Sequence, residues 1–256
     1  MAASAALAGT PVPVRSSPLV VLYIERPPYY RTGPDGSAGG ALVEIARLVF
    51  ERAGIRHRFV SMPARRILHT IRKGAPVCSV GWLRTRERET FGRFSEPIYR
   101  NLPLGALVRR DALQRWPARP TLRHAMRSRL VLGLVKGYRY GPRVEAERVR
   151  LHPRTVVVAG GQDNLLRMLV RGRVDWMFIC PEEAAYRFRT DPEIATRTAF
   201  VRFQDPPPGN RRYIFFSRAV SVEVIQAVNE AIRRVIRTDR YREIVGKLRA
   251  GAQEGP

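Results

Sequence analysis

The chain has 256 residues, 45% of them hydrophobic, and a formal net charge of +24. This length exceeds that of most single cores, so we expect two compact domains or one large α/β domain, and no apolar run is long enough to predict a membrane-spanning helix. Only Lys73, Lys136 and Lys247 are lysines, and the arginines are spread along the chain without a dense block. The charge therefore indicates attraction of anionic ligands, while binding of nucleic acid or another polyanion stays an alternative.

The first 18 residues are rich in alanine and proline and contain small residues like those that precede a signal cleavage site. They lack a charged start and a long apolar stretch. Two interpretations stay open for residues 1–18, a shortened export signal and a disordered tail.

Strands and helices alternate through the first hundred residues. An apolar, β-rich run over 19–24 ends at the prolines of "ERPPYY", and a helix follows with Leu42, Ile45, Ala46 and Val49 on one face. A strand over 58–62, a helix that closes at Gly74 and a strand over 77–83 come next. This alternation predicts a mostly parallel sheet with crossover helices.

The pattern is interrupted by the extended stretch "YRNLPLGALVRRD" and then resumes. It ends with the β-rich "RRYIFFS" and a long amphipathic helix. We predict an α/β protein of two lobes, each a mostly parallel sheet flanked by helices. Lobe 1 comprises 19–107 and 205–250, lobe 2 comprises 108–204, and hinge crossings lie within 101–108 and 198–211.

Three segments, "ERPPYY", "GWLRTRERE" and "LVKGYRYG", follow predicted strands, so all three should face the crevice between the lobes. In the second segment, Thr85 is placed to cap a short helix that has Arg88 as its third residue. A guanidinium in the first turn opposes the helix dipole unless an anion is near. Arg88 is therefore a candidate to bind a carboxylate, and the alternative is a surface arginine paired with Glu87 or Glu89.

Several motifs together resemble the family 3 extracellular solute-binding proteins. They are a Pro-aromatic turn at Pro28 and Tyr29, "T-x-x-R" at Thr85 and Arg88 with "F-S-x-P-I-Y" after it, and "L-x-x-G-R-V-D" ending at Asp175. The similarity covers about residues 19–248. It implies a type II periplasmic-binding fold, export to the periplasm, and delivery of a small ligand to the membrane permease of an ABC transporter.

The resemblance also implies where the ligand binds. Arg88 matches the arginine that holds a ligand carboxylate, Gly81 and Trp82 match the strand end that faces the ligand, and Tyr29 or Tyr30 matches the aromatic wall. The expected ligand-binding set comprises Glu25, Tyr29, Tyr30, Gly81, Trp82, Thr85, Arg88, Gly137, Tyr138 and Tyr140, in which the turn from Gly137 to Tyr140 contributes the second-lobe contacts.

One expected match is missing. The acid that binds the ligand ammonium in amino-acid receptors would fall near Cys180, and the nearest acids, Glu182 and Glu183, are predicted in the following helix. This absence favours an organic anion without an ammonium group as an alternative to an amino acid. Glu25 could supply the missing charge, or could be an exposed carboxylate paired with Arg26 or Arg31.

We predict a monomeric binding protein for a small carboxylate-bearing ligand, without enzymatic activity, metal or other cofactor. Cys78 and Cys180 lie in apolar runs at no metal-ligand spacing, and the histidines form no catalytic motif. The alternatives are a dehydratase-like enzyme on the same scaffold with Glu25 as its acid or base, a ligand-sensing module, and a polyanion-binding protein.

Overall fold

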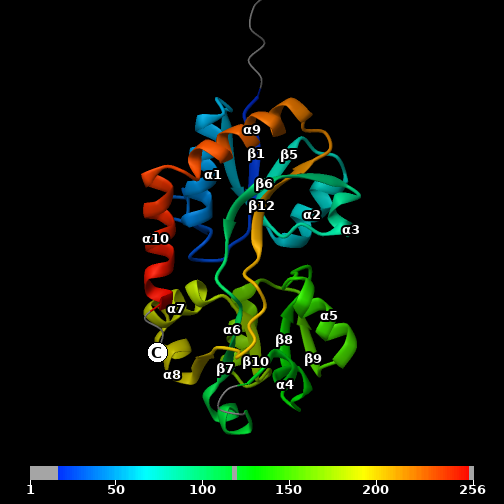
Figure 1. Ribbon diagram of the computed structural model, residues 1–256, viewed down its shortest axis with the longest axis vertical. Helices are drawn as coiled ribbons and strands as arrows, with labels where there is room; N and C mark the ends of the chain where they lie inside the picture. The colour runs from blue at the N-terminus through cyan, green and yellow to red at the C-terminus, as the bar shows by residue number, and fades with distance from the viewer. Residues whose placement is uncertain (1–16, 117–119, 254–256) are drawn as a thin grey trace, which may run out of the picture.

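The computed structural model describes residues 17–116 and 120–253. They form two lobes stacked along the long axis of the molecule, each built on a five-stranded sheet (Figure 1). The predicted two-lobed α/β fold is confirmed. Most of the expected N-terminal tail, residues 1–16, lies outside the described residues.

Lobe 1 has the strand order β4-β1-β5-β12-β6, in which β1 is parallel to β4 and β5, and β12 is antiparallel to β5 and β6. A two-residue ribbon of β2 and β3 lies beside it. The strands are β1 (Leu19–Tyr23), β2 (Arg31–Thr32), β3 (Ala38–Gly39), β4 (His57–Ser61), β5 (Val77–Trp82), β6 (Gly92–Arg100) and β12 (Arg211–Ser217), and the helices are α1 (Ala41–Arg52), α2 (Ala64–Arg72), α3 (Arg86–Glu89) and α9 (Val222–Val235).

Lobe 2 has the order β11-β7-β10-β8-β9, with β8, β9 and β10 parallel and β7 antiparallel to β10 and β11. The strands are β7 (Gly105–Arg109), β8 (Leu132–Val135), β9 (Thr155–Val158), β10 (Trp176–Ile179) and β11 (Thr198–Val201), and the helices are η1 (Arg110–Arg115), α4 (Leu122–Arg127), α5 (Pro142–Leu151), α6 (Gln162–Val170), α7 (Pro181–Thr190) and α8 (Pro192–Arg197).

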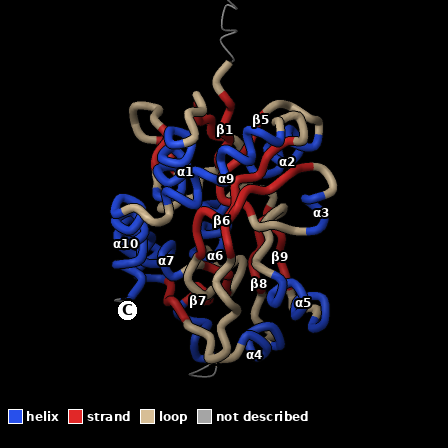
Figure 2. Tube along the Cα trace, turned by 45° about the horizontal axis from the view of Figure 1, so that its top comes forward, coloured by secondary structure: helices blue, strands red, loops and turns tan. Residues whose placement is uncertain are grey.

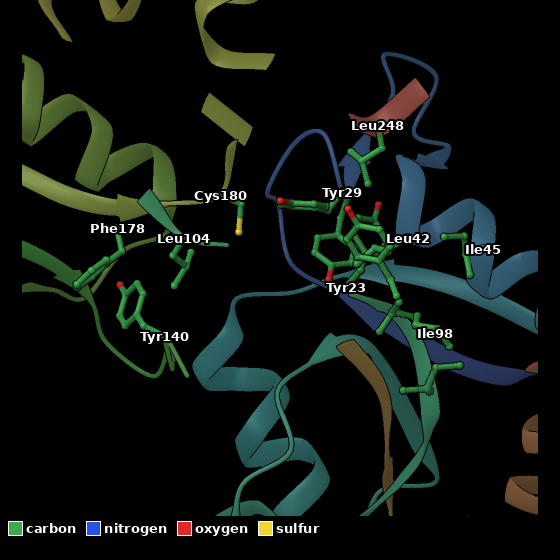
Figure 3. Close-up of a cluster of buried hydrophobic side chains, with 14 of the residues drawn as sticks. Tyr23, Tyr29, Leu42, Ile45, Ile98, Leu104, Tyr140, Phe178, Cys180 and Leu248 are labelled. Atoms are coloured by element: carbon green, nitrogen blue, oxygen red, sulfur yellow. The ribbon is translucent and has the colours of Figure 1, made fainter. Parts of the chain in front are cut away.

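Apolar packing continues from one lobe into the other. In lobe 1, the predicted face of α1 is fully buried, because Leu42, Ile45 and Val49 repeat at helical spacing. Their cluster extends to Phe178 of lobe 2, with Leu104 and Cys180 between the lobes (Figure 3). The two lobes therefore share a buried contact in this structure.

Two irregular segments, 101–104 and 202–210, connect the lobes side by side, since the amide of Asn101 donates to the carbonyl of Asn210 at 3.1 Å. Strand β7 lies in the sheet of lobe 2, so the first crossing ends at residue 104 and the predicted boundary between 107 and 108 falls inside a strand. The second crossing contains three consecutive prolines at 206–208.

The last helix, α10 (Asp239–Gln253), leaves lobe 1 beside α1 and packs against α7 of lobe 2 (Figures 1 and 2). Near its end, the carbonyl of Ala252 accepts a 2.9 Å hydrogen bond from Arg202 in the second crossing. The predicted assignment of 205–250 to lobe 1 alone is therefore incomplete, because this helix contacts both lobes.

Candidate functional site

A small cavity of about 40 Å³ lies between the lobes at the strand ends singled out above. Lobe 1 contributes the chain after β1, the end of β5 and the start of β12, and lobe 2 contributes the turn after β8. The lining residues are Ile24, Arg26, Ala64, Val80, Gly81, Trp82, Leu83, Arg88, Gly137, Tyr138, Arg139 and Arg212. The predicted convergence of the three segments is therefore seen in the structure.

Arg88 reaches this cavity from α3. The Thr85 hydroxyl accepts a hydrogen bond from the Arg88 amide at 3.3 Å, so Thr85 caps the helix as predicted. The Arg88 side chain is only 4% exposed, and its guanidinium donates to the carbonyls of Leu83 at 2.8 Å and Gly137 at 3.1 Å. Because Leu83 belongs to lobe 1 and Gly137 to lobe 2, this guanidinium bonds to both lobes.

The structure contradicts the alternative in which Arg88 is a surface residue paired with Glu87 or Glu89. Glu89 pairs with Arg84 at 2.6 Å, and Glu87 pairs with Arg139 at 2.7 Å. Burial, followed by repulsion from Arg139, lowers the pKa of Arg88 to about 10, so the group is still charged at neutral pH. Across the described residues, no carboxylate lies within salt-bridge distance of it.

Trp82 and Gly81, the end of β5, line the cavity beside Arg88. The Arg88 guanidinium is 4.6 Å from the centroid of the Trp82 ring, whose N–H donates to the Ser79 hydroxyl at 2.7 Å. Gly81 has φ +84°, and a Cβ there would be 1.5 Å from the Tyr30 hydroxyl oxygen. Only glycine fits this strand end, and Tyr30 supports it from behind.

Arg26, next to the predicted Glu25, crosses from lobe 1 to lobe 2. Its guanidinium donates to both carboxylate oxygens of the fully buried Glu183, the shortest contact being 2.8 Å. The rings of Tyr29 and Tyr138 have their centroids 5.8 and 5.3 Å from its Cζ. Burial opposes the charge of Arg26, but attraction to Glu183 outweighs it and raises the pKa of the guanidinium.

Glu25 itself does not line the cavity. It is exposed and accepts hydrogen bonds from the Thr32 amide at 3.1 Å and the Ser61 hydroxyl at 2.7 Å. The ion pair of Glu25 with Arg26 or Arg31 that we considered is therefore not formed among the described residues, and neutral donors bind Glu25 instead. The residue that turns inward after β1 is Arg26, so the first strand end brings a positive charge to the cavity where we had expected a negative one.

The remaining predicted residues divide between the cavity and its surroundings. Gly137 and Tyr138 line it, whereas Tyr29 is buried and does not, and its hydroxyl accepts a 3.0 Å hydrogen bond from the side-chain amide of Asn101. Thr85 and Tyr140 line a neighbouring groove of about 750 Å³. There, the hydroxyl of Tyr140 accepts a 3.0 Å hydrogen bond from the Val135 amide, which fixes the turn of lobe 2.

The region around Cys180 holds two acids that do not line the cavity. Glu182 accepts hydrogen bonds from the Tyr99 hydroxyl at 2.7 Å and the Leu102 amide at 2.8 Å, and Glu183 pairs with Arg26. Both are in the first turn of α7, as predicted. Cys180 is buried, and burial together with Glu182 raises the pKa of its thiol to about 11.

Sequence reasoning missed three charged cavity residues, Arg26, Arg139 and Arg212, of which Arg139 lies inside the predicted turn from Gly137 to Tyr140. Arg212 is the second residue of β12, and its guanidinium donates to the Asn101 side chain and to the carbonyl of Gly81 at 3.3 Å. A signal for Arg212 exists, because the chain re-enters lobe 1 at β12 and the first residues of that strand must lie near the crevice. Among the described residues there is no group of acids, histidines or cysteines fit to hold a metal.

A model of the bacterial extracellular solute-binding proteins, family 3, matches residues 19–248. The chain belongs to this family. This confirms the family resemblance noted from the sequence. No curated protein sequence matches the chain. Within the described ranges, no helix has the length and apolar character needed to cross a membrane.

Several solved structures have a similar fold over nearly the whole chain. An ancestral arginine-binding protein bound to arginine has a TM-score of 0.73 at 16% identity, covering 91% of this chain and 98% of that one. The substrate-binding protein of an amino acid ABC transporter has a TM-score of 0.72 at 15% identity, covering 91% and 99%. These solute-binding relatives share the two-lobed fold.

Sensor domains have the same fold. A histidine kinase sensor domain with similarity to periplasmic binding proteins has a TM-score of 0.72 at 21% identity, covering 90% of this chain and 95% of that one. The periplasmic domain of Bordetella pertussis BvgS has a TM-score of 0.73 at 18% identity, covering 90% of this chain and 42% of that one. Solute-binding proteins and sensors are therefore both represented among the structural neighbours.

Proposed function

We propose that this family 3 protein captures a small carboxylate-bearing ligand, an amino acid or a related organic anion, in the cavity between its lobes, and delivers it to an ABC-type permease from the periplasm. The observation that carries the proposal is Arg88. It is a buried guanidinium at the interlobe cavity, bonded only to main-chain carbonyls and without an acidic partner among the described residues.

A carboxylate is the natural partner for such a group. Guanidinium and carboxylate form two parallel hydrogen bonds, and these bonds gain strength when water is excluded. Because Arg88 bonds to Leu83 of lobe 1 and Gly137 of lobe 2, a ligand held there stabilises the closed arrangement of the lobes. Closure around the ligand is then what a permease would recognise.

Sensing is the second candidate, and the sensor-domain neighbours favour it. In that case the same closure is passed to a receptor and not to a permease. For an enzyme, in contrast, the proposed acid or base Glu25 lies outside the cavity, and the family consists of binding proteins. The net charge of +24 attracts anions in general, so we interpret any polyanion binding as non-specific and not as the function.

The test of ligand capture is a thermal-shift and calorimetric screen of the purified protein against amino acids, organic acids and amines, with native mass spectrometry of the unscreened sample. We expect a hit whose affinity falls at least about tenfold in Arg88→Gln, since a hydrogen bond to a charged group contributes about 1.5–3 kcal/mol. Arg86→Gln is the matched control, because Arg86 is exposed on the same helix. Equal affinities in both variants would refute the proposed site.

Delivery and sensing are separated in cells that lack the gene. Loss of uptake of the radiolabelled ligand supports the permease route. Intact uptake with loss of the transcriptional response to the same ligand supports sensing and refutes delivery.

A further inference from the structure

The cavity lining is charged with one sign only. Its charged members are Arg26, Arg88, Arg139 and Arg212, and no aspartate or glutamate lines it in the part of the chain that the structure describes. Water-excluded cavities rarely hold several like charges, because each charge loses hydration and repels the others. The question is which of these four charges the protein itself compensates.

Two of them are compensated from outside the cavity. Glu183 approaches Arg26 from lobe 2 with a bidentate contact and is itself fully buried, so its negative charge is already paired. Arg139 is exposed and pairs with Glu87 at 2.7 Å. Neither arginine needs a ligand to balance its charge.

Arg88 and Arg212 are not compensated. Both bond to carbonyl oxygens at the same strand end, Arg88 to Leu83 and Arg212 to Gly81, two residues apart. The remaining contact of Arg212 is the Asn101 side chain, and no carboxylate in the described ranges forms an ion pair with either guanidinium. Repulsion from Arg212 also helps to lower the pKa of Arg88, so the two charges lie close enough to interact.

We infer that the ligand is a small anion with two negative charges and no ammonium group, and that Arg212 is a second anion-binding residue beside Arg88. The inference rests on the proposed function and specifies the ligand class of that site. An ammonium group would enter a cavity whose charged walls are all guanidinium groups, and the one carboxylate close behind them is bonded to Arg26. A dianion instead balances the two uncompensated charges.

The first test compares four probes by isothermal titration calorimetry on the full chain. Succinate and inorganic phosphate are dianions, L-aspartate is succinate with an added ammonium, and propionate carries a single carboxylate. We expect succinate or phosphate to bind at least about tenfold more tightly than L-aspartate and propionate, the difference expected for one charged hydrogen-bond partner. Preference for succinate identifies a dicarboxylate and keeps the carboxylate of the proposed function. Preference for phosphate keeps the doubly charged ligand but replaces the carboxylate by a single doubly charged group. L-aspartate binding as tightly as succinate, or no binding by any dianion, would overturn the inference.

The second test assigns the second charge to Arg212. We expect Arg212→Gln to lower affinity for the preferred dianion at least about tenfold while changing propionate affinity less than about threefold. Arg211→Gln is the control, because Arg211 is the exposed neighbour on the same strand. Since Arg212 also bonds to the first crossing, Arg212→Lys is included; it keeps the charge, and it should bind the dianion more tightly than Arg212→Gln does. Equal losses for dianion and monoanion in Arg212→Gln would overturn this assignment.

Failure of this inference can be told apart from failure of the proposed function. An amino acid that binds with Arg88-dependent affinity keeps the proposed function and removes the dianion. A screen in which no compound depends on Arg88 removes both.

Discussion

Lobe 1 and lobe 2 bring different chemistry to the cavity that they share. Lobe 1 lines it with the charged residues Arg26, Arg88 and Arg212. Lobe 2 lines it with Gly137, Tyr138 and Arg139, whose charge is paired with Glu87, and its Glu183 holds Arg26 from outside the lining. Among the described residues, the two cavity arginines without a carboxylate partner, Arg88 and Arg212, therefore both belong to lobe 1. The contacts of lobe 2 with these arginines, Gly137 with Arg88 and Glu183 with Arg26, form where the two lobes meet.

The largest expected effect comes from removing the acid of lobe 2. Glu183→Gln leaves Arg26 as a buried cation without a partner, and the free energy of unfolding should fall by about 3–5 kcal/mol in urea denaturation. Glu193→Gln, which removes one side of the exposed pair with Arg197, should cost less than about 1 kcal/mol. The double replacement Arg26→Met with Glu183→Leu should recover most of the loss. A cost below about 1 kcal/mol for Glu183→Gln would show that this pair does not join the lobes.

A somewhat smaller effect is expected on the wall of lobe 1. Gly81→Ala places a methyl group against the Tyr30 hydroxyl at a positive φ, and should destabilise the protein by about 2 kcal/mol or more. Thermal unfolding measures it. Gly246→Ala is the control, because a Cβ there meets no atom within 4 Å and lies in α10; it should be neutral or slightly stabilising. Equal behaviour of the two variants would mean that this strand end is not rigid.

The two cysteines should report separately on lobe closure and on unfolding. Burial raises the pKa of both thiols, that of Cys180 to about 11, so at pH 8 the folded protein should react with a disulfide reagent about a hundredfold more slowly than free cysteine. Cys180 lies between the lobes and Cys78 lies in β5, so Cys180 should react several-fold faster and be protected by ligand. The variants Cys78→Ser and Cys180→Ser resolve the two rates. Equal reaction rates of Cys78 and Cys180 would contradict the expectation that the lobes separate without unfolding of lobe 1.

The smallest expected effect is that of pH on ligand affinity. The charged groups of the cavity are arginines, and burial lowers the pKa of Arg88 to about 10, so Arg88 stays mostly charged up to pH 9. Affinity for succinate or phosphate, whichever binds, should change less than about threefold between pH 7.5 and 9. A tenfold fall in this window, measured by calorimetry, would show that an amino group or another titrating side chain takes part.

Local patterns were sufficient to predict the lobes and the position of Arg88. The alternation of strands and helices predicts the two sheets. The capping of α3 by Thr85 sets the position of Arg88 in the first turn of that helix. Helical and strand periodicity depend on neighbours in sequence, and a single chain contains that information. The placement of Gly81, Trp82 and Gly137 at the cavity follows from the same rule, because strand ends of one lobe face one crevice.

The charge pattern of the cavity could not be predicted in this way. Strand β1 ends at Tyr23, so no alternation rule extends to Glu25 and Arg26 to decide which of them turns inward. Arg26 is held by Glu183, which is 157 residues away, and such a pair depends on how the lobes meet. Arg212 was missed because its segment, "RRYIFFS", was interpreted only as a β-rich strand.

The three prolines at 206–208 restrict how the lobes can move apart. Proline fixes φ and has no amide hydrogen, so the backbone of this part of the second crossing has little conformational freedom and donates no main-chain hydrogen bonds. Gly209 follows at once, and a Cβ there would lie 1.8 Å from the carbonyl oxygen of Asn101 in the first crossing. Together with the hydrogen bond between Asn101 and Asn210, this close approach holds the two crossings against each other, so we expect any rotation of one lobe against the other to be centred there.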